Sequence, residues 1–73
     1  MPQLPILSGR ILIKIFIRIG YIIVNTKGSH VRLHHVARRP ITIPSYKTIS
    51  RGLLRQILRQ ADILPAEFLK MFK

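Results

Sequence analysis

The stretch YIIVNTKGSHVRLHH, residues 21–35, contains two runs of strand-forming side chains separated by a polar connection that includes Gly28. Residues 21–26 are rich in β-branched and aromatic side chains, which favour strands. Residues 30–35 form the second run, and its first five positions alternate between polar and apolar side chains. A connection of three to five residues that contains glycine is typical of a β-hairpin. The stretch therefore predicts two antiparallel strands joined by the segment KGS.

A third strand is expected downstream of this hairpin. Residues 36–39 (VARR) predict a second turn, and residues 40–44 (PITIP) predict a short strand. Pro40 and Pro44 mark its boundaries, because proline cannot donate a hydrogen bond within a sheet. The three strands are expected to form an antiparallel meander.

Two helices are expected after the third strand. Ser50 is a suitable N-cap for residues 51–61, RGLLRQILRQA, in which one helical face is apolar and another is basic. The apolar positions are Leu54, Ile57, Leu58 and Ala61, and the basic positions are Arg51, Arg55 and Arg59. Pro65 suits the first turn of a last short helix. Three apolar side chains of that helix are available to pack inward: Phe68, Leu69 and Phe72.

Residues 10–19, RILIKIFIRI, are compatible with either a strand or a helix. Every odd position from 11 to 19 is isoleucine, and this period of two with β-branched side chains favours a strand. However, Leu12, Phe16 and Ile19 also line one face of a helix. Ser8 is a suitable helix N-cap and Gly20 a suitable helix end. The local pattern leaves both structures open.

The composition indicates a folded, strongly basic chain. Its 73 residues suit a single domain, residues 1–73, in which residues 1–7 form an extended lead-in. The chain has thirteen Lys and Arg residues and only two acidic residues, Asp62 and Glu67, so its formal net charge is +11. Hydrophobic residues make up 48% of the chain, which is unlike a disordered basic tail. A folded body with this charge indicates an anionic partner: nucleic acid, an acidic protein or a membrane surface.

Two observations bear on the compartment. The chain has no cysteine, which agrees with a reducing intracellular environment, and no signal peptide is recognisable. The longest apolar region, residues 11–24, is interrupted by Lys14, Arg18 and Gly20 and is too short to span a membrane. A cytoplasmic location without membrane association is therefore expected.

The three histidines do not predict a metal site. In a strand, His30 and His34 share one face with Arg32 between them, whereas His35 points to the opposite face. His30 and His34 would lie about 13 Å apart, which is too far for one ion. No cysteine or nearby carboxylate completes a ligand set. Neither a metal nor another cofactor is expected.

The residues left for chemistry are a histidine beside a glycine turn and many cations. Ser29 precedes His30, but no carboxylate is placed to orient the imidazole as a catalytic triad requires. Cleavage of RNA through its own 2′-hydroxyl needs a general acid or base that works near neutral pH, and cations that stabilise the charged transition state. Contact with phosphate or water is the more common role of a lone strand histidine. The residues alone leave both roles open.

Several motifs, in this order, resemble the HicA (YcfA-like) toxins of bacterial and archaeal toxin–antitoxin modules. They are LSGR (7–10), KGSHVRL (27–33), ITIP (41–44), RGLLRQILRQA (51–61) and EF (67–68). The resemblance extends over roughly residues 7–69. Its most specific part is KGSH combined with GLLRQILRQA.

The resemblance implies an α+β fold in the order α-β-β-β-α, similar to double-stranded-RNA-binding domains, with a final short helix. Residues 9–19 would then be helical. It also implies a toxin that cleaves mRNA without a metal, with His30 as the catalytic residue, and a HicB-type acidic antitoxin that covers the active surface. The residues expected to contact RNA are Lys27, Gly28, Ser29, Arg32, His34, Lys47, Arg51 and Arg55.

The chain departs from the family pattern at several positions. Ile11, Ile15 and Ile17 stand where members often have polar residues, which predicts an exposed apolar patch for self-association or antitoxin contact. Asp62 replaces a usual helix-ending glycine, and Leu64 replaces a usual cap.

Tyr46 stands where many members have histidine, which keeps open the alternative of a module that binds RNA or antitoxin without cleaving RNA. The second acid–base group also stays open among Lys27, Tyr46 and His34.

Overall fold

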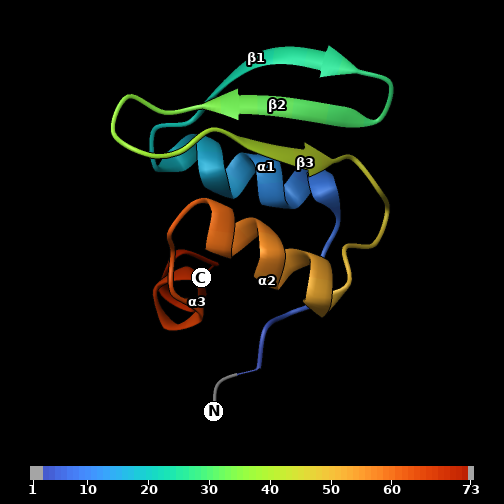
Figure 1. Ribbon diagram of the computed structural model, residues 1–73. Coiled ribbons are helices and arrows are strands. Elements are labelled where there is room, and N and C mark those ends of the chain that lie inside the picture. The colour runs from blue at the N-terminus through green and yellow to red at the C-terminus, as the bar shows by residue number, and fades with distance from the viewer. Residues whose placement is uncertain (1–2, 73) are drawn as a thin grey trace.

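The computed structural model describes residues 3–72, and their elements follow the expected order α-β-β-β-α-α (Figure 1). The elements are α1 (Gly9–Arg18), β1 (Ile22–Lys27), β2 (His30–His34), β3 (Ile41–Pro44), α2 (Arg51–Gln60) and α3 (Pro65–Phe72). No helix within residues 3–72 has the length and apolarity needed to cross a membrane.

The three strands form the predicted antiparallel meander, in the order β1-β2-β3. Lys27 pairs with His30 across the first turn, so Gly28 and Ser29 make the connection. Gly28 has a φ of 61°, which suits glycine at the first position of a type II′ turn. On the other side of β2, His30 pairs with Pro44. The hairpin geometry therefore places His30 in the middle strand, directly after the turn.

The sheet is covered on one face only (Figure 1). In β2, Val31 and Leu33 are buried, whereas the polar residues between and beside them are exposed. Ile41 and Ile43 of β3 are fully buried, and β3 contacts both α1 and α2. The opposite face, which carries His30, faces solvent. This arrangement is that of double-stranded-RNA-binding domains, as expected.

Residues 9–18 form a helix despite their local β pattern. The Oγ of Ser8 accepts a hydrogen bond from the N–H of Ile11 at 3.2 Å and caps the helix, as expected. Leu12 and Phe16 are buried against the sheet. Burial of one helical face outweighs the modest β preference of isoleucine, because packing supplies most of the stability of a short helix.

The prediction of an exposed patch of three isoleucines is wrong for Ile15. Ile11 and Ile17 are 48% and 45% exposed, but Ile15 is only 3% exposed. Positions 12, 15, 16 and 19 lie on one face of an α-helix, since they are spaced by three and four residues. Ile15 therefore belongs to the core, and a self-association surface through all three isoleucines does not exist.

The end of α1 depends on two residues in special positions. Gly20 has a φ of 107°, and a Cβ there would lie 2.8 Å from Nε2 of His35. This Nε2 lies 2.8 Å from the carbonyl oxygen of Ile19, while Nδ1 accepts from the N–H of Ala37. Nε2 therefore carries the proton, because a carbonyl oxygen only accepts. His35 is a structural residue that joins the end of β2 to the end of α1.

Tyr21 connects this region to the loop between β2 and β3. Its ring is 1% exposed and packs edge-on against Phe16, with ring centroids 5.3 Å apart. Its hydroxyl donates to the carbonyl oxygen of Arg39 at 2.9 Å. Burial raises the pKa of Tyr21, and the charge of Arg38 partly opposes that change. The loop before β3 is thus held against the core.

The second half of the chain confirms most of the expected helix pattern. The Oγ of Ser50 accepts from the N–H of Leu53 at 3.1 Å and caps α2. The four apolar positions predicted for α2 are all buried: Leu54, Ile57, Leu58 and Ala61. Asp62 has a φ of 59°, the left-handed conformation that glycine usually supplies after a helix. At the start of α3, the N–H of Leu64 donates to Oε1 of Glu67 at 3.3 Å.

The inward packing predicted for α3 is correct for Phe68 and wrong for Phe72. Phe68 is fully buried and Leu69 half-buried, whereas Phe72 is 40% exposed. The rings of Phe68 and Phe72 are stacked with centroids 6.2 Å apart. Phe68 occupies the position toward the core, so Phe72 covers it from outside and keeps contact with solvent.

Candidate functional site

An open hollow of about 280 Å³ lies between the exposed face of β2 and β3 and the neighbouring side of α2. It is lined by His30, Arg32, Thr42, Pro44, Tyr46, Leu53, Gln56, Ile57 and Gln60. We call it the His30 hollow. Its side chains come from the middle strand, the edge strand, the loop after β3 and the helix α2, so the whole fold is needed to form it.

His30 is held in this hollow by the backbone around it. Ser45, directly after β3, donates to the carbonyl oxygen of Ser29 from its N–H at 2.7 Å and from its hydroxyl at 3.1 Å. These bonds attach the β1–β2 turn to the end of β3. His30 thus has a fixed backbone position, while its imidazole stays exposed.

Tyr46 lies beside His30, with ring centroids 6.3 Å apart and planes at 77°. Its position is set by α1, because the N–H of Gly9 donates to the carbonyl oxygen of Tyr46 at 2.8 Å. Gly9 also approaches the backbone of Pro44 and Ser45 closely enough to leave no room for a Cβ. The start of α1 therefore positions the loop that carries Tyr46.

Arg32 supplies a cation to the hollow. Its Nη1 donates to Oγ1 of Thr42 on the adjacent strand at 3.0 Å. A guanidinium has five N–H donors, so most of them remain free for an anion. The contact with Thr42 orients the guanidinium without neutralising it.

Five other predicted RNA contacts do not line the His30 hollow, and four of them lie near it. Gly28 and Ser29 form the turn beside His30, and Lys27 is the cross-strand partner of His30. Lys47 is exposed and follows Tyr46. His34 shares the exposed face but lies at the far end of β2, opposite Ile22.

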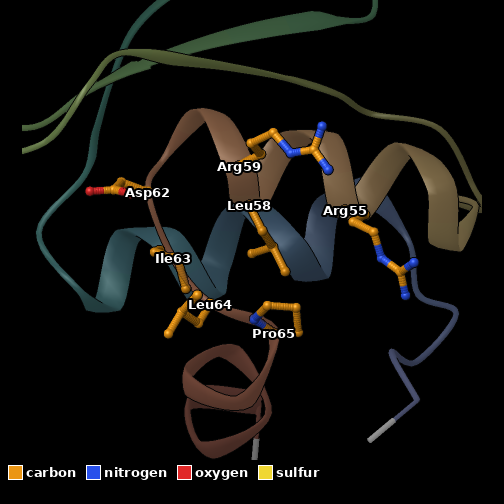
Figure 2. A pocket seen from close by; sticks show the side chains of 7 residues that line it. All are labelled: Arg55, Leu58, Arg59, Asp62, Ile63, Leu64 and Pro65. Atoms are coloured by element: carbon orange, nitrogen blue, oxygen red, sulfur yellow. The ribbon is translucent and has the colours of Figure 1, made fainter. Parts of the chain in front are cut away.

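The two predicted contacts on α2 lie away from His30. Nε of Arg51 donates to the carbonyl oxygen of Leu4 at 2.7 Å and so fastens the segment before α1. Arg55 lines a different hollow, of about 250 Å³, between α2 and the start of α3 (Figure 2). In Figure 2, Arg59 extends toward the side of the sheet, whereas Arg55 extends away from it. Both arginines line this hollow, whereas Arg51 does not, so the three arginines do not form one continuous surface.

The α2 side chains that do reach the hollow were not among the expected site residues. They are Leu53, Gln56 and Gln60, together with Ile57 of the buried stripe. Their spacing of three and four residues places them on one helical face beside the buried stripe. This spacing is the sequence signal that could have identified them as site residues. A choice of α2 residues by positive charge alone misses the neutral glutamines.

No cluster of three or more His, Cys, Asp or Glu side chains that could bind a metal occurs within residues 3–72. The imidazole, guanidinium and phenol groups of the His30 hollow instead suit proton transfer and anion binding.

The fold and the site together define a small α+β domain of the double-stranded-RNA-binding type with an exposed histidine on its central strand. Residues 9–63 match the family model described as HicA toxin of bacterial toxin-antitoxin. The chain therefore belongs to the HicA toxin family, which identifies it as the toxin of a toxin–antitoxin system and implies an antitoxin partner. No curated protein matches the chain. The matched range includes His30, Tyr46 and the whole of α2.

Proposed function

We propose that the protein is an endoribonuclease that cleaves mRNA without a metal ion, with His30 as a catalytic residue. The observation that carries this proposal is the His30 hollow, in which an exposed imidazole lies beside a phenol and a guanidinium. Membership of the HicA family supports the same activity.

The proposed reaction uses the 2′-hydroxyl of the RNA as nucleophile. The 2′-oxygen bonds to the adjacent phosphorus, the bond from phosphorus to the 5′-oxygen breaks, and a 2′,3′-cyclic phosphate and a 5′-hydroxyl result. His30 accepts the proton of the 2′-hydroxyl, a role that suits a side chain whose ordinary pKa is near neutral. Arg32 stabilises the additional negative charge on the phosphorane oxygens.

Tyr46 is the best placed of the three candidates for the second acid–base group. It lines the same hollow as His30, whereas Lys27 and His34 do not. In-line displacement places the entering and leaving oxygens on opposite sides of phosphorus, so the base and the acid must face the phosphate from two directions. The two rings, 6.3 Å apart and nearly perpendicular, suit that requirement. We propose that the Tyr46 hydroxyl donates the proton to the leaving 5′-oxygen.

A substrate comparison tests this proposal. Purified protein in excess EDTA is expected to cleave a single-stranded RNA and to leave 2′,3′-cyclic phosphate ends, detected by mass spectrometry. The same sequence made of 2′-deoxynucleotides should stay intact, because it lacks the nucleophile.

The second candidate function is a module that binds RNA or an antitoxin without cleavage, and it is favoured by Tyr46 in place of the family's usual histidine. RNA that binds with a steep salt dependence but stays intact over hours would establish it and refute the nuclease.

Replacing Tyr46 by phenylalanine is expected to reduce the rate constant of the cleavage step about 100-fold, because general acid catalysis contributes on that scale. Tyr46→His should retain activity, since imidazolium also donates a proton. The measurement is single-turnover cleavage of a labelled RNA at saturating protein. If Tyr46→Phe cleaves at the wild-type rate and either Lys27→Met or His34→Phe does not, the acid is that other residue.

We also propose that the antitoxin is an acidic protein of the HicB type that covers the His30 hollow. The net charge of +11 supports an acidic partner as well as RNA. An antitoxin on this face would block access of RNA to His30 and Tyr46.

A further inference from the structure

A second hollow, also of about 280 Å³, adjoins the His30 hollow along α2. It is lined by Arg39, Gln56, Arg59 and Gln60. Gln56 and Gln60 line both hollows. The two hollows are therefore neighbouring parts of one surface, which runs from His30 past two amides to two guanidiniums. We call its four polar residues beyond His30, namely Arg39, Gln56, Gln60 and Arg59, the glutamine–arginine track.

The far end of this track has a fixed backbone. Arg39 belongs to the loop between β2 and β3, and its carbonyl oxygen accepts the hydrogen bond of the buried Tyr21 hydroxyl. Nη1 of the adjacent Arg38 lies 3.5 Å from the carbonyl oxygen of Ala61, just after α2. Residues 37–39 of this loop line one hollow together with Ala61 and Asp62, directly after α2. The core thus holds Arg39 next to α2.

The track is long enough for more than one nucleotide. Pro44, the cross-strand partner of His30, lies five residues after Arg39. At ~3.3 Å per residue this separation corresponds to about 16 Å along the edge of the sheet. An RNA strand whose scissile phosphate lies at His30 would follow this edge to reach Arg39.

The side chains of the track are available for a ligand. All four are exposed, and none of them forms a side-chain hydrogen bond within residues 3–72. Each amide offers two donors and one acceptor, which is the chemistry of base edges, and each guanidinium matches a phosphate. Asp62 lines neighbouring hollows with Arg39 and Arg59 but not the hollow that these arginines share with the glutamines.

We propose that the glutamine–arginine track binds the single-stranded RNA that flanks the scissile phosphate. Gln56 and Gln60 contact base edges and set the sequence preference, whereas Arg39 and Arg59 bind phosphates further along the strand. This inference rests on the proposed nuclease function for the position of the scissile phosphate. RNA is favoured over an acidic protein as the occupant because the track continues directly from the His30 hollow and offers unpaired amides between the catalytic group and the cations.

Salt dependence of RNA binding tests the role of the arginines. The probe is a 12-nucleotide RNA with 2′-O-methyl groups, which the protein binds but cannot cleave by the proposed route. For Arg39→Gln and Arg59→Gln, the slope of log affinity against log salt is expected to be ~0.7 smaller than for wild type. The matched control is Arg18→Gln on α1, which removes the same charge from an exposed side chain and should leave the slope unchanged.

Cleavage-site mapping tests the role of the amides. Gln56→Met and Gln60→Met keep the side-chain length and remove the polar atoms. The substrate is an RNA pool whose sequence is randomised around one cleavage position. In each variant, the preference for one base over the others on one side of the cut is expected to be about tenfold weaker than in wild type. The preference on the other side should not change.

The outcomes separate this inference from the function on which it rests. If wild type cleaves RNA but the arginine variants match Arg18→Gln and the glutamine variants keep the wild-type base preference, the track is wrong and the nuclease stands. If wild type leaves unmodified RNA intact, the nuclease fails, whatever the binding slopes show. If Arg39→Gln and Arg59→Gln cleave RNA normally but escape inhibition by an acidic antitoxin, the surface binds the antitoxin and the proposal is overturned.

Discussion

Replacing His30 by alanine is expected to abolish RNA cleavage while leaving the fold intact. The imidazole is the only histidine in the His30 hollow, and removal of a general acid or base lowers rates by about 10² to 10⁴. The side chain is exposed, so its removal leaves no cavity in the core. The measurement is kcat/KM on a labelled RNA, together with growth arrest after expression. Thermal unfolding of the same protein should give an unchanged Tm.

His34→Ala is the matched control for this experiment. His34 lies on the same face of β2 and is also exposed, but it does not line the hollow. It should retain most of the cleavage rate, with a modest loss of affinity at most. A His30→Ala protein that still degrades RNA at the wild-type rate would refute the assignment of His30. Equal losses from both replacements would indicate a shared role in binding instead of catalysis.

The fold was largely predictable because each element carries its own local signal. Ser50 marks the start of α2, and Gly28 marks the hairpin turn. Residues 9–18 are the exception, since their period of two and their helical stripe coexist in one segment. The choice between them depends on partners outside the segment, namely the buried face of the sheet. Only the family resemblance supplied this information at the level of sequence.

The candidate site was less predictable, since it joins residues from separate elements. Strand alternation places His30 and Arg32 on one face, which the structure shows as well. Strand alternation does not predict which side of α2 lies next to that face. Selecting α2 residues by charge therefore favoured Arg51 and Arg55, although Gln56 and Gln60 line the hollow. The distance between Tyr46 and His30 likewise depends on how α1 holds the loop after β3.

Gly9→Ala is expected to destabilise the protein more than other single-methyl additions. A Cβ at Gly9 would contact the carbonyl oxygen of Pro44 and lie 2.8 Å from the Cα of Ser45. These are backbone atoms, and the His30–Pro44 pair and the bonds from Ser45 to Ser29 hold them in place. Overpacking of a rigid site costs about 3 kcal/mol, which lowers the Tm of a domain of this size by more than about 10 °C.

Gly52→Ala is the control for this prediction, because it adds the same methyl group in the first turn of the other long helix. Nothing lies within 4 Å of a Cβ at Gly52, so the change should stabilise the protein by up to about 1 kcal/mol through helix propensity. Urea denaturation of both variants gives the comparison. Since Gly9 also donates to Tyr46, the Gly9→Ala protein that remains folded should cleave RNA more slowly. Equal stability of the two variants would show that α1 does not approach the end of β3 as closely as described, and would remove the structural basis for placing Tyr46 beside His30.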